Sequence, residues 1–156
     1  MSEKMKPRKG FSSDEGVIEE VLRKGEVLHL ALKDTDGVYS VPVNYGFKRG
    51  AIYIHSSKTG RKISALALGD EVGFSVLASH EVKPHEKPCK WGCSFSSVVG
   101  CGVPRILEDR EKIAALNLIM KQYSDEKWEI EPAAASAIEV VEIMITTATA
   151  RIVDRE

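Results

Sequence analysis

The sequence predicts a mainly β protein, an antiparallel β-barrel with α-helices at its periphery. Most segments between turns are short and rich in β-branched and aromatic residues, as strands are. Turn signals such as Asp-Thr-Asp-Gly at 34–37 join neighbouring strands directly and predict hairpins. The expected order is a helix, four strands around one short helix, then a strand, a helix and a strand. This order lacks the regular alternation of βαβ units.

Length and composition narrow the classes of protein further. The chain has 156 residues, 43% of them hydrophobic, which predicts a single domain at 11–156 with an ordinary core. A formal charge of −1 gives no overall basic field, so we expect no nucleic-acid partner. Residues 1–10 are rich in basic side chains and are predicted to be a mobile arm. The arm lacks the apolar core of a secretory signal, and no later run is long enough to span a membrane. Together with an odd number of cysteines, this predicts a cytoplasmic protein with reduced thiols and no membrane partner.

The N-terminal part is predicted to fold as a helix followed by a strand. Ser12 and Glu15 form a capping-box pattern, and an apolar stripe with the helical period follows, so we expect a helix over about 13–24. A glycine closes this helix. The nearly continuous apolar run at 27–32 predicts a strand, in which His29 is interpreted as a core or interface histidine.

The next predicted strand, over 39–47, shows a clear alternation of faces. Val41 and Val43 fall on one face, whereas Asn44 falls on the other. Pro42 cannot donate a hydrogen bond to a neighbouring strand, so it marks either the edge of a sheet or a backbone that faces a planar ligand. In both cases part of this strand is expected to lack a neighbouring strand.

The stretch at 52–66 concentrates the polar chemistry. A strand at 52–54 is followed by a polar, basic turn and then by a short helix. Arg61 and Lys62 provide two cations, and arginine can hold phosphate oxygens with two hydrogen bonds. Three hydroxyl side chains can cap the helix or donate to a phosphate: Ser56, Ser57 and Thr59. The pattern indicates an anion-binding turn, and a basic, solvated helix start without a ligand is the alternative.

Residues 78–91 show no periodicity and are predicted to form a loop between strands at 71–77 and 95–106. Gly100 and Gly102 in the second strand indicate a bulge or the close approach of a ligand. Four side chains in and after the loop offer the donors of a zinc site: His80, His85, Cys89 and Cys93. Their spacing is unlike that of structural zinc sites, so we expect no metal and interpret the segment as a solvated loop that could cover a cofactor cleft.

The last third of the chain is predicted to contain one helix and one long strand. Asp109 is the expected cap of a helix over 110–123. A second loop at 124–137 leads to a strand over 138–153, which is rich in β-branched residues.

Several segments resemble one known family in their order and spacing. The first block consists of YSVPVNYGF at 39–47, IYIHSS at 52–57 and TGRKISAL at 59–66. A second block starts with SSVVGCG at 96–102 and continues through EDREK at 108–112 to Tyr123. These blocks resemble the FMN-binding split-barrel family that includes pyridoxamine 5′-phosphate oxidase, and within it the nitroimidazole-resistance-like group. The similarity covers residues 11–154, so it implies an FMN-binding split barrel for the whole domain.

The resemblance also implies where FMN is held. Arg61 and Lys62 would grip its phosphate, with Ser56 and neighbouring backbone amides completing the cradle. One strand would line the flavin ring and ribityl chain, at Val41, Val43 and Asn44. Ser97 stands where the oxidases carry a ring-contacting amide side chain. Because serine is shorter than glutamine, contact through the main chain or through water is as consistent with this position as direct contact.

The quaternary structure and the substrate follow from the same resemblance. Members of the family typically pair as homodimers with the cofactor in the cleft between subunits, so a homodimer is implied here. The arginine and histidine with which the oxidases bind their substrate have no match in residues 147–155. Oxidation of pyridoxamine phosphate is therefore disfavoured.

His55 is the candidate catalytic residue, and it is also placed beside the cofactor. Nitroimidazole-resistance-like members tend to carry histidine at this position. An imidazole can deliver the proton that accompanies flavin electron transfer, and it can equally bind a phosphate or a carbonyl. We expect an FMN-dependent oxidoreductase that reduces a small-molecule electron acceptor such as a nitroaromatic or a quinone. The alternative is a non-catalytic protein that binds FMN, haem or deazaflavin.

Overall fold

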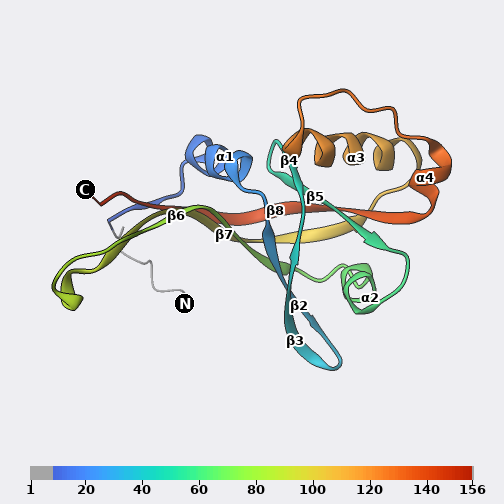
Figure 1. Ribbon diagram of the computed structural model, residues 1–156. Helices are drawn as coiled ribbons and strands as arrows, with labels where there is room; N and C mark the ends of the chain where they lie inside the picture. Colours follow the sequence, from blue (N-terminus) through green and yellow to red (C-terminus); the bar gives the residue numbers. More distant parts are fainter. Residues whose placement is uncertain (1–8, 156) are drawn as a thin grey trace.

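The computed structural model describes residues 9–155, which form one antiparallel sheet with helices around it (Figure 1). The basic arm predicted at 1–10 lies almost entirely outside the described residues. The strands are β1 (Phe11–Ser12), β2 (Leu28–Asp34), β3 (Gly37–Val43), β4 (Gly46–Lys48), β5 (Ala51–Ser57), β6 (Val72–Lys83), β7 (Gly92–Ile106) and β8 (Ile138–Val153). Their order is β3-β2-β6-β7-β8-β5-β4, with β1 paired to β8. The predicted mainly β architecture is confirmed.

Four α-helices and one 3₁₀ turn accompany the sheet. They are α1 (Glu15–Lys24), α2 (Arg61–Ala67), η1 (Pro88–Lys90), α3 (Asp109–Tyr123) and α4 (Pro132–Ser136). In Figure 1, α1 and α3 lie on one side of the long strands, whereas α2 and the β2–β3 hairpin lie on the other. No helix among residues 9–155 is long and apolar enough to cross a membrane.

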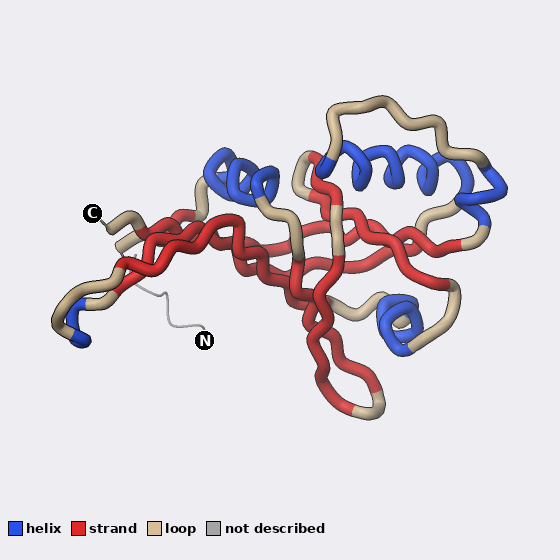
Figure 2. The backbone as a smooth tube through the Cα atoms, in the orientation of Figure 1, coloured by secondary structure: helices blue, strands red, loops and turns tan. Residues whose placement is uncertain are grey.

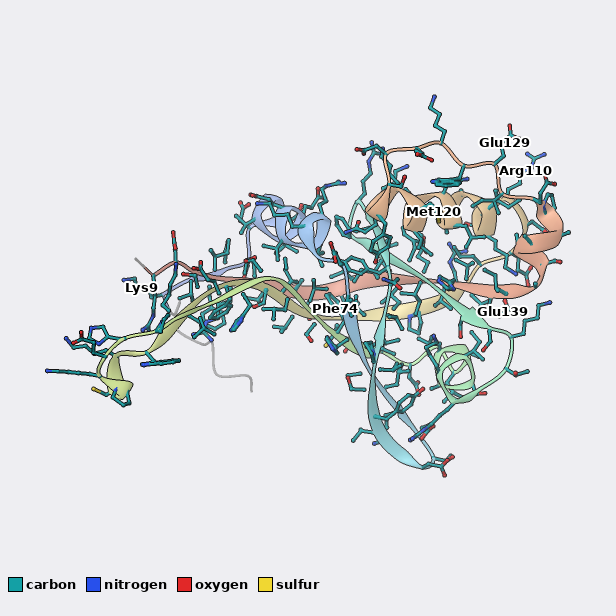
Figure 3. The ribbon with its side chains drawn as sticks, viewed as in Figure 1. Lys9, Phe74, Arg110, Met120, Glu129 and Glu139 are labelled. Atoms are coloured by element: carbon teal, nitrogen blue, oxygen red, sulfur yellow. The ribbon has the colours of Figure 1, made fainter. Side chains whose placement is uncertain are left out.

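Two hydrophobic clusters hold these layers together. The larger cluster joins the inner faces of the strands to α1 and α2, and includes Phe74 near the middle of the sheet (Figure 3). The smaller cluster packs α3 and α4 on the outer side of β5 and β8, through residues such as Leu116 and Val140. β5 is therefore covered on both sides, with Ile54 in the larger cluster and Tyr53 against the smaller one.

The prediction of a loop at 78–91 is wrong for the first half of this segment. β6 continues to Lys83 and pairs with β7 as far as Gly92, so that the unpaired segment shrinks to 84–91. Residues 79–96 form a two-stranded projection, the β6–β7 arm, that extends away from the rest of the sheet (Figure 2). Residues 79–82 are all partly or fully exposed, so neither face of the strand needs apolar residues. The alternation that normally reveals a strand is therefore missing from the sequence.

The glycines of β7 accommodate protein atoms rather than a ligand. A side chain at Gly100 would meet the ring of Phe74 and the carbonyl of Thr147, and one at Gly102 would meet Ile143 and Met144. The pairing with β8 shifts between Cys101 and Gly102, which confirms the expected bulge. These glycines therefore allow close packing of neighbouring strands, and not the close approach of a ligand that the sequence also suggested.

Both expected helix caps are wrong by one or two residues. Asp14 caps α1, because its carboxylate accepts a 3.0 Å hydrogen bond from the backbone N–H of Val17. The hydroxyl of Ser12 accepts a 3.1 Å hydrogen bond from the backbone N–H of Asp14. Glu108 precedes α3, and its side chain makes no capping bond.

Residues at the C-terminal end of α3 form hydrogen bonds to the C-terminal end of α1. The side-chain amide of Gln122 donates to the carbonyls of Leu22, Arg23 and Gly25, at 3.0, 3.1 and 2.8 Å. Tyr123 accepts a 2.9 Å hydrogen bond from the backbone N–H of Tyr45 and donates a 2.6 Å bond to the carbonyl of Glu26. The last carbonyls of α1 are thus satisfied by a helix about 100 residues away in the sequence.

Candidate functional site

The predicted basic turn lies between β5 and α2. β5 ends at Ser57, whose hydroxyl donates a 2.7 Å hydrogen bond to the carbonyl of Thr59. Gly60 then adopts a φ of 119°, which favours glycine, and α2 begins at Arg61. The predicted succession of strand, turn and helix is confirmed. The expected hydroxyl cap is wrong, because Gly60 is the N-cap residue and no side chain caps the helix.

The guanidinium of Arg61 is bound to the β2–β3 hairpin. Its Nε donates to Oδ2 of Asp34 at 2.7 Å, and its Nη2 donates to Oδ1 at 2.9 Å. Nη2 also lies 3.4 Å from the carbonyl oxygen of Gly37. These hydrogen bonds raise the pKa of Arg61 and lower the pKa of Asp34, so both groups keep their charge at neutral pH. Within the described residues, the remaining nitrogen, Nη1, makes no hydrogen bond.

Tyr39 of β3 packs against this guanidinium, with its ring centroid 4.1 Å from Cζ of Arg61. The hydroxyl of Tyr39 is buried and has no hydrogen-bond partner among residues 9–155. Burial raises the pKa of Tyr39, so the group stays protonated and can donate. Sequence reasoning did not select Tyr39 as a site residue, although it starts the first stretch of family resemblance and shares the face of Val41 and Val43.

The second cation, Lys62, has a different environment from Arg61. Its side chain is half-buried, and no carboxylate of the described chain lies within 4.0 Å of it. Burial lowers the pKa of Lys62. Because the favourable interactions of an ion pair are missing, this ammonium group is the cation of the turn best prepared to receive an external anion.

His55 lies close to Lys62, at the end of β5. Its pKa is lowered, first by desolvation and second by the positive charge of Lys62. His55 is on the face of β5 opposite Ile54, and on the same face as Tyr53, as the alternation predicts. The adjacent Ser56 is only 4% exposed, so its side chain faces the core. Ser56 pairs with Glu139, which lies near the start of β8 (Figure 3).

The strand expected to line the cofactor is interrupted, because β3 ends at Val43 and β4 begins at Gly46. Val41 is half-buried, Val43 belongs to the core, and Asn44 is exposed. The amide nitrogen of Asn44 donates a 3.3 Å hydrogen bond to the carbonyl of Glu26. β3 is the last strand on its side of the sheet, which confirms the edge that Pro42 indicates.

Ser97 lies on a different side of the molecule from these strand residues. It is paired with Leu77 of β6 and Arg151 of β8. Val98, the next residue, is fully buried in the core together with Val43, so the side chain of Ser97 points to the opposite, outer side of the sheet. One chain therefore does not bring the side chains of Ser97 and Val43 to the same ligand.

The four side chains considered for zinc belong to the β6–β7 arm. In the described part of the chain, no group of three or more histidine, cysteine or acidic residues is placed to hold a metal ion. His85 instead organises the tip of the arm. Its Nδ1 accepts a 3.0 Å hydrogen bond from the backbone of Lys87, and its carbonyl accepts a 2.6 Å bond from the indole of Trp91.

Two hollows in the structure lie away from the basic turn. One, of about 820 Å³, lies between α1 and β8, and its lining includes Phe47, Arg49 and Thr147. A hollow of about 460 Å³ on the outer side of the sheet is lined by small residues such as Gly73, Ser75 and Thr149. A third hollow, of about 510 Å³, lies beside the β5–α2 turn, where Lys58 lines it together with residues of α3 and α4.

An antiparallel sheet with the strand order described above, an exposed edge strand at β3 and helices outside its core define the class of split β-barrel proteins. The sequence agrees with this class. Residues 14–152 match the sequence profile described as pyridoxamine 5′-phosphate oxidase, and the chain belongs to this family. No functionally curated protein gives a significant sequence match.

Several solved structures share the fold at low sequence identity. A candidate 5-nitroimidazole antibiotic resistance protein from Bacteroides thetaiotaomicron is 22% identical, with a TM-score of 0.79, over 97% of this chain and 96% of that one. An FAD- and haem-binding protein from Mycobacterium smegmatis is 16% identical, with a TM-score of 0.83, over 94% and 75%. An FAD-binding protein from Mesorhizobium loti is 20% identical, with a TM-score of 0.66, over 92% and 97%.

Proposed function

We propose that this protein binds a flavin, and specifically FMN, with the phosphate held at the β5–α2 turn. The observation that carries the proposal is the pair of consecutive cations, Arg61 and Lys62, of which Lys62 has no carboxylate partner in residues 9–155. Membership of the family supports it, as do the names of structural neighbours that bind FAD.

The residues at the turn fit a phosphate group on two counts. Lys62 is a half-buried cation without an ion-pair partner in the described chain, and Arg61 has one nitrogen free of hydrogen bonds. β3 is an edge strand, so one side of its backbone has no neighbouring strand, and in our proposal the planar ring lies along Val41, Val43 and Asn44, the residue after the strand.

A bound flavin supplies the redox chemistry, and the protein has only to bind it, orient it and move protons. In our proposal Arg61 and Lys62 bind the phosphate, and the edge of β3 orients the ring. His55 holds the proton that accompanies reduction of a small electron acceptor, such as a nitroaromatic or a quinone. Because its pKa is lowered, His55 is mostly neutral at pH 7 in the unliganded protein, and proton donation becomes more effective as the pH falls.

We further propose that the protein is a homodimer in which the outer side of the sheet is buried. Four large apolar side chains on that side are 42–53% exposed in one chain: Leu77, Val99, Val103 and Met144. Ser97 lies on the same outer side. In a dimer packed through this side, Ser97 of one chain would come within reach of the cofactor that the other chain binds, whereas Ser97 of the binding chain itself would not. Apolar faces of this kind are typical of obligate interfaces.

The alternative is a cofactor-binding protein without turnover, which binds a flavin, haem or deazaflavin. Its support is the haem and FAD named for the neighbour from Mycobacterium smegmatis. The absorption spectrum after addition of each cofactor separates these cases: bound flavin gives bands near about 370 and 450 nm, whereas haem gives an intense Soret band.

The phosphate turn is tested by changing both cations together. Arg61→Ala combined with Lys62→Ala should weaken FMN binding by about 3 kcal/mol or more, which is at least about 100-fold in Kd. FMN affinity equal to that of the wild type, in a variant with an unchanged circular dichroism spectrum, would refute the proposed site.

A further inference from the structure

Asp34 is the one acidic residue in the described chain that forms an ion pair with a cation of the β5–α2 turn. It lies at the end of β2, 27 residues before Arg61, and its side chain is only 15% exposed. Nothing in the charge pattern of the turn itself requires an acid here, because a carboxylate beside an anion site repels the anion. The position of Asp34 therefore needs a reason of its own.

The contacts of Arg61 suggest that reason. Asp34 takes the Nε and Nη2 edge of the guanidinium, at 2.7 and 2.9 Å, and the Tyr39 ring covers one of its faces. A guanidinium is planar, so contacts along one edge and against one face together fix its orientation. The N–H groups of Nη1 are left without a partner in the described chain, and they point away from the bound edge.

We propose that Asp34 is a positioning residue for phosphate binding: it holds Arg61 so that Nη1 is presented to the phosphate of the flavin as a fixed donor. This inference rests on the proposed function of the turn. It adds the β2–β3 hairpin to the site, and it divides the two cations between two roles. Arg61 is a donor held in place by protein contacts, and Lys62 is a mobile point charge.

Two opposed effects decide how loss of the Asp34 charge changes affinity. A free arginine side chain must give up rotamer freedom when it binds phosphate, a loss that can reach about 30-fold in affinity. Removal of the carboxylate also relieves repulsion of the phosphate. That repulsion acts across the guanidinium, a distance shorter than the screening length of about 8 Å at physiological ionic strength, so salt reduces it only in part. The positive charge of Arg61, which lies between the two anions, offsets the rest. We expect the loss of fixation to dominate, with a net weakening of about fivefold to tenfold.

The variant Asp34→Asn tests this with little disturbance of the hairpin. The backbone N–H of Asp36 donates to Oδ1 of Asp34 at 2.9 Å, and the carbonyl oxygen of asparagine can accept the same bond. FMN and riboflavin are titrated separately at about 0.15 M salt, because riboflavin has the same ring without the phosphate. A positioning role predicts a weaker FMN complex and unchanged riboflavin affinity. A general structural defect would weaken both ligands equally and would overturn the proposal.

Asp36→Asn is the matched control for charge. Asp36 lies in the same hairpin turn and acts on Arg61 through its charge, without a hydrogen bond to the guanidinium. This variant should leave FMN affinity unchanged or increase it slightly. If Asp34→Asn increased FMN affinity as well, or left it unchanged, Asp34 would not be a positioning residue.

A double-mutant cycle with Arg61→Gln shows whether Asp34 acts through Arg61. The effect of Asp34→Asn on FMN affinity should disappear in the Arg61→Gln background, and an effect of the same size in both backgrounds would overturn the proposal. FMN binding by the wild type separates the proposed function from the proposed role of Asp34. Absence of FMN binding by the wild type would refute the proposed function and the role of Asp34 together, whereas tight wild-type binding with no effect of Asp34→Asn would refute only the latter.

Discussion

Replacement of Lys62 by glutamine should weaken FMN binding and stabilise the protein without a ligand. Lys62 is half-buried, and no carboxylate of residues 9–155 lies within 4.0 Å of its ammonium group. A charge-assisted hydrogen bond contributes about 1.5–3 kcal/mol, so Lys62→Gln should raise the Kd for FMN by about 10- to 150-fold. Riboflavin affinity should not change, because the lost contact is made to the phosphate.

The second half of this prediction follows from the pKa of Lys62, which burial lowers. A base with a lowered pKa in the folded state binds fewer protons there than in the unfolded chain, so its charge opposes folding at neutral pH. Lys62→Gln removes that charge and should raise the melting temperature of the ligand-free protein. The gain should shrink as the pH rises through the pKa of the lysine, where the wild type loses the same charge.

The measurements are fluorescence titrations with FMN and riboflavin, and thermal unfolding without ligand. Lys58→Gln is the matched control, because Lys58 is an exposed lysine of the same turn. It should change both quantities little. Equal losses of FMN affinity in the two lysine variants would show that general charge, rather than a contact by Lys62, governs binding. A lower melting temperature for Lys62→Gln would contradict the argument from burial.

Three further predictions concern the fold, the proton and the assembly. Gln122→Leu removes the donor that satisfies three carbonyls at the end of α1, and urea unfolding should show a loss of about 1–3 kcal/mol; an unchanged midpoint would mean that water replaces the amide. Turnover of a nitroaromatic acceptor should fall as the pH rises through the pKa of His55, which lies below its ordinary value of 6.5, and His55→Gln should flatten this profile while FMN content is retained. A profile that His55→Gln leaves unchanged would exclude this proton donor. Val99→Asp places a charge on the outer side of the sheet and should convert a dimer near twice 17.2 kDa into a monomer with weakened FMN binding, as sedimentation would detect; a wild type that sediments as a monomer with tightly bound FMN would refute the dimer.

The sequence predicts the strands that contribute side chains to the core, because burial requires apolar and β-branched residues there. β2 and β5 both contribute to the core, and both are predicted close to their observed positions. The outer part of β6 follows no such rule. Its residues from Ser79 to Lys83 are held only by pairing with β7 and touch no core, so their order in the sequence carries no signal of a strand.

The candidate site was predictable only where its parts are neighbours in the sequence. Arg61 and Lys62 stand out as adjacent cations after a polar turn, and the structure places them at the start of α2. The contact of Arg61 with Asp34 joins residues 27 positions apart and depends on how the β2–β3 hairpin lies beside α2. The unpaired hydroxyl of Tyr39 is visible only once its surroundings are known, since a tyrosine in a strand is ordinary. In the sequence, Arg61 and Lys62 are simply two adjacent cations. In the structure, only Arg61 forms an ion pair with a carboxylate, that of Asp34.

The most direct test of the proposed phosphate site is the ratio of the riboflavin and FMN dissociation constants of the wild-type protein, measured by titration calorimetry under one set of conditions. The site predicts one FMN per chain and an affinity for FMN at least about 100-fold above that for riboflavin, because two charge-assisted contacts depend on the phosphate. Equal affinities for the two ligands, or no binding of either, would contradict a flavin phosphate site at the β5–α2 turn.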